Sequence, residues 1–261
     1  MQLPGNSRKY FFWTLNALLG AAFMVELVAP GRFHWMFAAL IVLAAVTGLV
    51  ALNRQLPLQD VLSAAFITAV MGGVVHGLSA RTHIPLGPIV FNTEAGAQLF
   101  DAVPWTIPLL WVAAIFTARG VGRLILRPWR KVKNYGYWLI GLTSVLVLAF
   151  DIALEPYAWH AKHLWLWQPT KLAVSWHGAA LLNFLGWGLT ALFILMFITP
   201  SLIRKQPGSS STVDYHPLAV WLGALLLFAI GAADAKMWWS VGADSLIAAV
   251  TVVFAFRGAR W

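Results

Sequence analysis

Long apolar runs separated by short polar or proline-containing connections dominate the chain. Each run approaches the roughly 20 residues that a helix needs to cross the hydrocarbon core of a bilayer. The pattern therefore predicts an all-α polytopic integral membrane protein with about eight transmembrane helices, seven being the alternative count. The predicted spans are Phe11–Ala29, Trp35–Ala51, Asp60–Ser79, Ala102–Ala118, Tyr135–Leu154, Ala179–Thr199, Leu218–Ala235 and Trp239–Phe256.

The composition supports a membrane environment and removes some chemistry. Hydrophobic residues make up 60% of the chain and charged residues 10%, which excludes a water-soluble surface. The chain has no cysteine, so disulfides, thiolate metal ligands and iron–sulfur clusters are excluded. The first span resembles a signal peptide, but Glu26 interrupts it and no small-residue cleavage site follows. We expect a retained helix.

Basic residues divide unequally between the two sides that alternating spans define. Thirteen of the eighteen lysines and arginines fall on the side of the termini, and the remaining five lie opposite: Arg32, Arg81, Lys162, Lys171 and Lys236. Because cytoplasmic connections collect basic residues, both termini are predicted to be cytoplasmic, in a multi-pass protein of the inner membrane. The net charge of +9 is then a topology signal that favours contact with anionic lipid and not with nucleic acid.

Polar residues from distant segments share one depth on the opposite, outer side. Glu26 and Asp151 lie near the outer ends of their spans, and His76 and Asn183 fall at the same level. A polar pocket in the outer half of the membrane would explain this distribution. A solvated helix end is the alternative interpretation for each acid taken alone, since a side chain there can reach interfacial water.

The stretch "FDIALEP" places Asp151 and Glu155 four residues apart, hence on one helix face. Like charges at that spacing destabilise a helix unless one is protonated or partnered. The spacing also resembles the metal-diphosphate motifs of membrane prenyltransferases, but it lies on the outer side and no second acidic motif accompanies it. The pair is therefore a candidate for acid–base chemistry.

Two outer connections, 80–101 and 155–178, are too elaborate for simple links. Proline and glycine interrupt the first, and such backbone is tolerated at membrane depth only where protein covers it or it lines a cavity. The second is rich in tryptophan, which indicates either an interfacial belt or a surface for a cation or a conjugated chain. We predict a six-helix core with these loops over 1–203, a cytoplasmic linker over 204–216 and two C-terminal helices over 217–261.

Other motifs narrow the chemistry further. The chain has no G-x-G-x-x-G after a strand and no P-loop. The close pair His160 and His163 lacks the additional histidine clusters of a membrane di-iron enzyme, and we interpret it as structural. The sequence therefore predicts neither a metal site nor a cofactor.

Several short motifs together resemble the carotenoid biosynthesis protein family, which includes the carotenoid 1,2-hydratases of the bacterioruberin and γ-carotene pathways. The resemblance covers most of residues 70 to 200. It is carried by "PLG" at Pro85–Gly87, "VPWTIPLLW" at Val103–Trp111, Asp151 with Leu154, Glu155 and Pro156, "WLW" at Trp165–Trp167 and "NFLGW" at Asn183–Trp187. The sequence departs from the family pattern at His76, Ile89 and Phe91, which puts the particular reaction in question.

The resemblance implies an acyclic carotenoid substrate, a lipid bilayer environment and hydration of a terminal C1–C2 double bond without a cofactor. Such a reaction needs a proton donor, a stabilised tertiary cation and a placed water. Asp151 is the candidate acid, because a carboxylic acid shielded from water can stay protonated and donate. Glu155 or Glu26 is the candidate base. Asn183 would hold the water, and the substrate-binding candidates are Trp165, Trp167, Trp187, Trp111, Pro85, Gly87, Phe91 and His76.

Two other functions remain open. An end-group cyclase or isomerase would form the same cation and then lose a proton instead of capturing water. A proton-coupled transporter would use buried acids as a relay. Self-association, or association with other carotenoid enzymes, is also open.

Overall fold

The computed structural model describes residues 5–30, 32–33, 35–169, 174–203 and 213–261, and it confirms the predicted helical membrane fold. In this part of the chain eight helices are long and apolar enough to cross a membrane. They are α1 (Gly5–Val28), α2 (Met36–Asn53), α3 (Leu58–Thr82), α4 (Thr106–Ile125), α5 (Tyr135–Pro156), α6 (Leu181–Ile198), α7 (His216–Asp234) and α8 (Trp238–Ala259).

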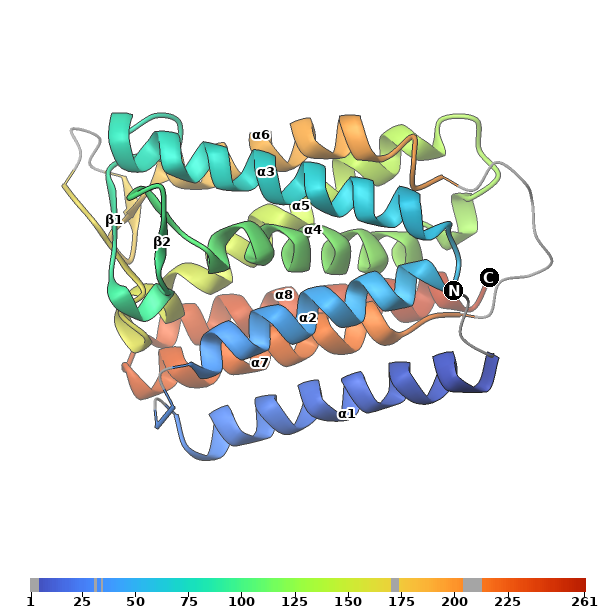
Figure 1. Cartoon of the computed structure of the whole chain (residues 1–261), viewed down its shortest axis with the longest axis horizontal. Coiled ribbons are helices and arrows are strands. Elements are labelled where there is room, and N and C mark those ends of the chain that lie inside the picture. The colour runs from blue at the N-terminus through green and yellow to red at the C-terminus, as the bar shows by residue number, and fades with distance from the viewer. Residues whose placement is uncertain (1–4, 31, 34, 170–173, 204–212) are drawn as a thin grey trace.

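The helix α4 forms the centre of the bundle. It runs between α2, α3, α5, α7 and α8, whereas α1 lies at one side and α3 and α6 at the other (Figure 1). In α4, 78% of the most apolar 18-residue stretch of the helix is buried inside the protein, and in α1 the corresponding share is 17%. An apolar helix that is mostly exposed within the protein has its hydrophobic surface available to lipid.

Short strands close one end of the bundle, which we call the strand end. The strands are β1 (Ile89–Phe91), β2 (Gln98–Leu99), β3 (Val103–Pro104), β4 (Trp165–Trp167), β5 (Ser175–Trp176) and β6 (Ala179–Ala180). They form three antiparallel pairs, β1 with β4, β2 with β3 and β5 with β6. The beginning of α1 and the C-terminus lie together at the opposite end, the terminal end (Figure 1).

One predicted boundary is wrong in α4. The sequence pattern ended this span at Ala118, before a charged residue, but the helix continues to Ile125. Arg119 is only 2% exposed, and its guanidinium donates a hydrogen bond to the Leu202 carbonyl at 3.0 Å. A carbonyl in the turn that follows α6 thus accepts from a cation that would otherwise end the span.

The end of α5 also differs from its prediction. Glu155, which was placed in a connection, lies within the helix, and a π-helical turn, η3 (Tyr157–Ala161), extends it. Pro156 lacks the N–H that would bond to the Ile152 carbonyl. The indole Nε1 of Trp176 donates to that carbonyl instead, at 3.1 Å.

The C-terminal helices pack against the rest of the bundle. Both α7 and α8 contact α4 and α5, and α7 also contacts α1 and α2. The proposed division into a six-helix core and a two-helix unit stays a prediction, and residues 204–212 of the predicted linker lie outside the described residues.

Candidate active site

Asp151 and Glu155 form the centre of a buried polar cluster at the strand-end half of α5. Their exposed fractions are 0% and 2%. The side-chain amide of Asn183 on α6 donates to Asp151 Oδ2 at 2.8 Å and to Glu155 Oε1 at 3.1 Å. Because an amide nitrogen carries two hydrogens, one Asn183 side chain can bridge both carboxyl groups. The three residues form one hydrogen-bonded unit.

Two tryptophans fix the second oxygen of Glu155. The indole Nε1 of Trp167 donates to Oε2 at 2.7 Å and that of Trp165 at 3.1 Å. Both rings point inward and Leu166 points outward, because side chains alternate along the strand β4. The "WLW" motif therefore places two donors on one carboxylate oxygen.

Two oxygens of this cluster are left with unused hydrogen-bonding capacity. Among the described residues, Asp151 Oδ1 and Asn183 Oδ1 are buried and have no hydrogen-bond partner. A buried polar atom without a partner costs about 1–3 kcal/mol, so such atoms are uncommon unless a ligand or water completes them. They are the two atoms of the cluster whose hydrogen-bonding capacity the described residues do not use.

The turn at Pro85–Gly87 packs directly on α6. Leu86 is fully buried, and its backbone N–H donates to Ser79 Oγ at 2.8 Å. A Cβ on Gly186 would lie 2.5 Å from Leu86 Cδ2, so this close approach requires glycine in the "NFLGW" motif. The predicted substrate-binding turn and the motif that carries Asn183 are thereby held together.

The strand β1 follows the Pro85–Gly87 turn and pairs with β4, which contains Trp165 and Trp167. Phe91 is paired with Trp165 and Ile89 with Trp167 across the β1–β4 ladder. The rings of Phe91 and Trp165 meet edge to face, with their centroids 6.3 Å apart. Three of the sequence motifs thus converge at the strand end.

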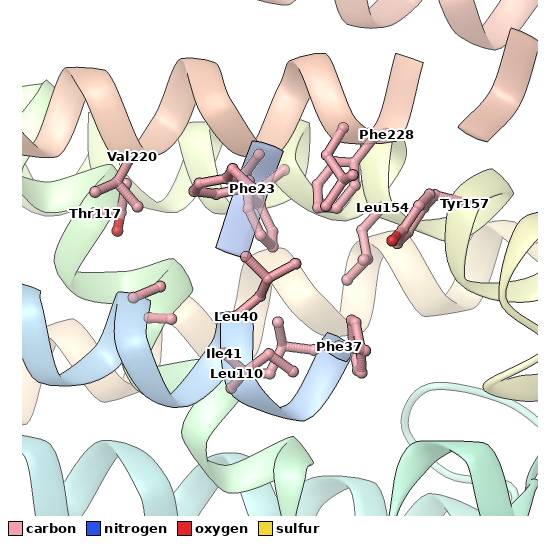
Figure 2. Close-up of a pocket in the computed structure, with 15 residues that line it drawn as sticks. Phe23, Phe37, Leu40, Ile41, Leu110, Thr117, Leu154, Tyr157, Val220 and Phe228 are labelled. Carbon is pink, nitrogen blue, oxygen red and sulfur yellow. The ribbon is translucent and has the colours of Figure 1, made fainter. Parts of the chain in front are cut away.

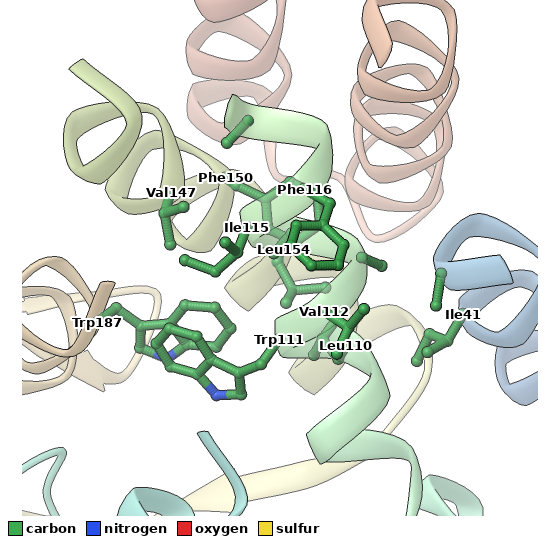
Figure 3. Packing of buried hydrophobic residues seen from close by; sticks show 14 of the residues in the cluster. Ile41, Leu110, Trp111, Val112, Ile115, Phe116, Val147, Phe150, Leu154 and Trp187 are labelled. Atoms are coloured by element: carbon green, nitrogen blue, oxygen red, sulfur yellow. The ribbon is translucent and has the colours of Figure 1, made fainter. Parts of the chain in front are cut away.

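A second group of aromatic side chains lies deeper in the bundle. Trp111 on α4 and Trp187 on α6 stack with their centroids 4.2 Å apart, and both are almost completely buried (Figure 3). Trp187 follows Asn183 by four residues and so shares its helix face. The stacked pair is therefore connected to the acid cluster through α6.

His76 joins this aromatic group from α3. Its ring lies 5.6 Å from that of Trp187 and 6.3 Å from that of Phe91. Trp111 Nε1 donates to His76 Nδ1 at 3.1 Å. The same Nδ1 also lies 3.1 Å from the Gly72 carbonyl oxygen, which can only accept, so the tautomer of His76 decides which of the two hydrogen bonds is made. Trp111 can approach α3 this closely because residue 72 is glycine, where a Cβ would lie 2.2 Å from the indole.

The structure brings most of the predicted site residues together, with one exception. Asp151, Glu155 and Asn183 form one cluster, and Trp165, Trp167, Pro85, Gly87, Phe91, His76, Trp111 and Trp187 surround it through the contacts above. Glu26 instead forms an ion pair with Lys162, on the side of the bundle where α1 packs on α2 and α7. Glu26 was predicted at the same depth as Asp151, but it does not join the acid cluster.

The sequence interpretation missed two side-chain contacts outside the acid cluster. Trp176 supplies the donor that the Ile152 carbonyl needs, and the signal for it was Pro156, which frees a carbonyl four residues earlier. Lys162 is the partner of Glu26, but a lysine in a connection gives no indication of which acid it meets.

A known protein family matches most of the chain. The model of the family described as "Carotenoid biosynthesis protein" matches residues 35–254, which includes every element of the cluster and its aromatic surroundings. No curated protein matches the chain, and no solved structure does.

Proposed function

The chain belongs to the carotenoid biosynthesis protein family, and on that premise we propose that it hydrates the terminal C1–C2 double bond of an acyclic carotenoid. Membership supports a role in carotenoid biosynthesis, as an enzyme acting on a carotenoid in the lipid bilayer. The particular reaction is our proposal. The observation that carries it is the buried unit of Asp151, Glu155 and Asn183.

Asp151 is the proposed proton donor. Two carboxylates bridged by one amide repel each other when both are ionised, so the pair is best accommodated with a single shared proton. Glu155 accepts three hydrogen bonds, which stabilise its anion, whereas Asp151 accepts one. The proton therefore resides on Asp151, whose Oδ1 is free to deliver it.

The reaction then balances without a cofactor. Transfer of the Asp151 proton to C2 leaves a tertiary cation at C1, and a water attacks C1. Glu155 takes a proton from that water, and exchange of a proton between the two carboxyl groups restores the starting state. The free Asn183 Oδ1 can accept a hydrogen bond from the water and so position it.

The aromatic residues suit the cation. An indole face near a cation contributes from about 0.5–1 kcal/mol to about 2 kcal/mol or more when desolvated. Trp111 and Trp187 present stacked indoles, and Trp165 and Trp167 have their N–H groups turned toward Glu155, which orients the rings beside the acid. Rings also exclude bulk water, so that only a bound water competes for the cation.

The decisive experiment replaces the proton donor. In a lycopene-producing bacterial host, we expect expression of the protein to yield a pigment heavier by one water. Asp151→Asn should lower its yield by about 10²–10⁴-fold, the usual contribution of a positioned acid. Asp101→Asn, which changes an exposed carboxylate at the strand end, is the matched control and should retain full yield.

Three results would contradict the proposal. Full yield from the Asp151→Asn variant would remove the proposed acid. An isomer of unchanged mass with shifted absorption would assign the protein as an end-group cyclase. An unchanged pigment, with lycopene and with other acyclic carotenoids, would remove the reaction altogether.

A further inference from the structure

A polar cavity of about 310 Å³ lies at the strand end among α1, α7 and η3, away from the candidate active site. Three helices that run toward this end stop beside it: α1 at Val28, α7 at Asp234, and α5 with its extension η3 at Ala161. No residue of the acid cluster lines it. Pockets for small ligands have volumes of about 300–1,000 Å³. The cavity can therefore admit a group of the size of a lipid headgroup.

The lining of the cavity favours a cation. A helix carries a partial negative charge at its C-terminus, and three such ends meet here. Among the described lining residues, Glu26 and Asp234 add two carboxylates, whereas Lys162 supplies one ammonium, which is paired with Glu26. His160 also lines the cavity, and its Nε2 lies 2.9 Å from the His177 carbonyl. The exposed Asp234 carboxylate is therefore the acid that a bound cation can reach.

Basic residues follow two of these helix ends. Lys236 comes directly after the lining residue Ala235, and Arg32 comes two residues after the lining residue Pro30. Both basic side chains are exposed. A negative lining with cations just beyond it is complementary to a zwitterionic group, in which a phosphate lies a few bonds from an ammonium.

The cavity lies at the depth at which a bilayer places its headgroups. Asp234 is the last residue of a helix that is long and apolar enough to cross a membrane. Trp238 and Trp239, at the beginning of α8, are 68% and 83% exposed. Tryptophan is enriched at the interface between membrane and water, where its ring meets both apolar and polar surroundings. A phospholipid headgroup can therefore reach the cavity from the bilayer.

The acyl chains of such a lipid would stay outside the bundle. Tyr157 and Leu227 line the polar cavity and also a narrow apolar void, whose walls include Phe37 and Phe228 (Figure 2). The void has a volume of only about 60 Å³, which is too small for an acyl chain. The chains would instead lie against α1, which has the smallest buried share of the described spans.

We propose that the cavity binds the headgroup of phosphatidylethanolamine, with the ammonium at Asp234 and the phosphate toward Lys236 and Arg32. A primary ammonium has three N–H donors for the carboxylate and for carbonyls at the helix ends. A choline headgroup lacks these donors and is typically recognised by a cage of aromatic rings. The phenol ring in the lining, that of Tyr157, already has the Lys162 ammonium 5.9 Å from its centre.

The bound headgroup would connect α1 to the rest of the bundle. The cavity lies between the ends of α1 and α7, and α1 is otherwise packed mainly on α2. A ligand that contacts both helix ends stabilises the folded protein, because it binds the folded state and not the unfolded chain. This site is independent of the proposed hydration reaction.

The test is native mass spectrometry of the purified full-length protein in detergent, mixed with equal amounts of dioleoyl phosphatidylethanolamine, phosphatidylcholine and phosphatidylglycerol. We expect one phosphatidylethanolamine to be retained in preference to the other two lipids. Asp234→Asn should weaken this retention by about 2- to 5-fold, the effect of an exposed ion pair. Asp101→Asn, which changes an exposed carboxylate at the strand end outside the cavity, is the matched control and should retain the lipid as the unchanged protein does.

A second variant keeps the test independent of the folding of the first. Ala235→Leu should place a larger side chain in the cavity and weaken retention while Asp234 is intact. Equal retention of the three lipids would overturn the proposal, and so would a preference for phosphatidylcholine or phosphatidylglycerol. Retention of phosphatidylethanolamine that is unchanged in both variants would also overturn it.

Thermal melting in detergent separates the lipid from a soluble amine, the other source of a primary ammonium. Phosphatidylethanolamine should raise the melting temperature, and Asp234→Asn should reduce that rise. Ethanolamine at the same concentration should have no effect, because it lacks the phosphate and the chains. Stabilisation by ethanolamine equal to that by phosphatidylethanolamine would overturn the assignment of a lipid.

Discussion

Asn183 shows how one side chain can determine the state of two others. Its amide nitrogen holds both Asp151 and Glu155, while its oxygen is free among the described residues. Replacement by leucine removes both donors at similar volume and leaves two buried carboxyl groups less satisfied. We expect Asn183→Leu to lower thermal stability in detergent, by about 1–3 kcal/mol in free energy, and to reduce pigment conversion by about 10-fold or more.

The control for this prediction is Asn16→Leu. Asn16 also donates from a helix, but to the Phe12 carbonyl of its own helix α1, and it does not touch the acid cluster. Thermal melting and pigment yield should change little in this variant. Unchanged stability and unchanged conversion in Asn183→Leu would show that the bridge is unimportant.

At the scale of elements, the contact between α6 and the Pro85–Gly87 turn positions the cluster. Gly186→Ala would place a methyl group 2.5 Å from Leu86 Cδ2 in a buried contact, and overpacking of this kind costs about 1–3 kcal/mol. Gly188→Ala on the same helix meets nothing within 4 Å, and alanine is the better helix former. We expect the melting temperature in detergent to fall in Gly186→Ala and to hold or rise in Gly188→Ala. The opposite order would contradict this packing.

The β5–β6 hairpin is attached to its surroundings through His177. Its Nε2 lies 2.8 Å from Ser240 Oγ on α8, and its carbonyl lies 2.9 Å from His160 Nε2. Partial burial, followed by the nearby His160, lowers the pKa of His177 below its ordinary 6.5. The unfolded chain therefore binds this proton more readily. The contribution of His177 to the free energy of unfolding is therefore fully present above pH 6.5, and it is lost as the pH falls below that value.

This linkage can be measured by thermal melting between about pH 7.5 and pH 5, the range in which histidine titrates. We expect His177→Asn to lose less stability over that interval than the unchanged protein. His83→Asn is the matched control, because His83 is exposed and also has a positive φ, 64° against 47° for His177. Equal pH profiles for the unchanged protein and His177→Asn would refute the assignment.

The presence of the eight helices could be predicted from the sequence. The residues at which they end, and the helices that each one packs against, could not. Apolar runs define a span irrespective of its partners, so all eight predicted helices are present. The ends depend on groups from elsewhere: Arg119 stays in α4 because the Leu202 carbonyl accepts from it. Strands of two or three residues are too short to show an alternating pattern.

The sequence also predicts the depth of a site residue better than its neighbours around the bundle. Depth along a helix can be deduced from position in a span, and it predicted that Asp151, Asn183 and His76 lie at one level. In the structure Asn183 donates to Asp151, and His76 contacts Trp187 one turn further along α6. Position around the bundle depends on packing, and Glu26 at a similar predicted depth is paired with Lys162 on another side. Residues from different family motifs do meet in the structure, as Leu86 of "PLG" and Gly186 of "NFLGW" show.

The whole molecule has two different ends. Strands and the acid cluster occupy one, and the basic connection at 127–133 lies at the other, with the beginning of α1 and the C-terminus. We propose, from the positive-inside rule, that the terminal end is cytoplasmic and that the acid cluster lies in the outer half of the membrane.

The absence of native cysteine makes this orientation directly measurable. A single cysteine at Gln98, exposed at the strand end, should react with a membrane-impermeant maleimide in cells whose outer membrane has been permeabilised. A single cysteine at Lys131, exposed at the terminal end, should react only after the inner membrane is lysed. The cysteine-free chain controls for background labelling. Labelling of the Lys131 position in unlysed cells, with protection at Gln98, would invert the topology and place the acid cluster toward the cytoplasm.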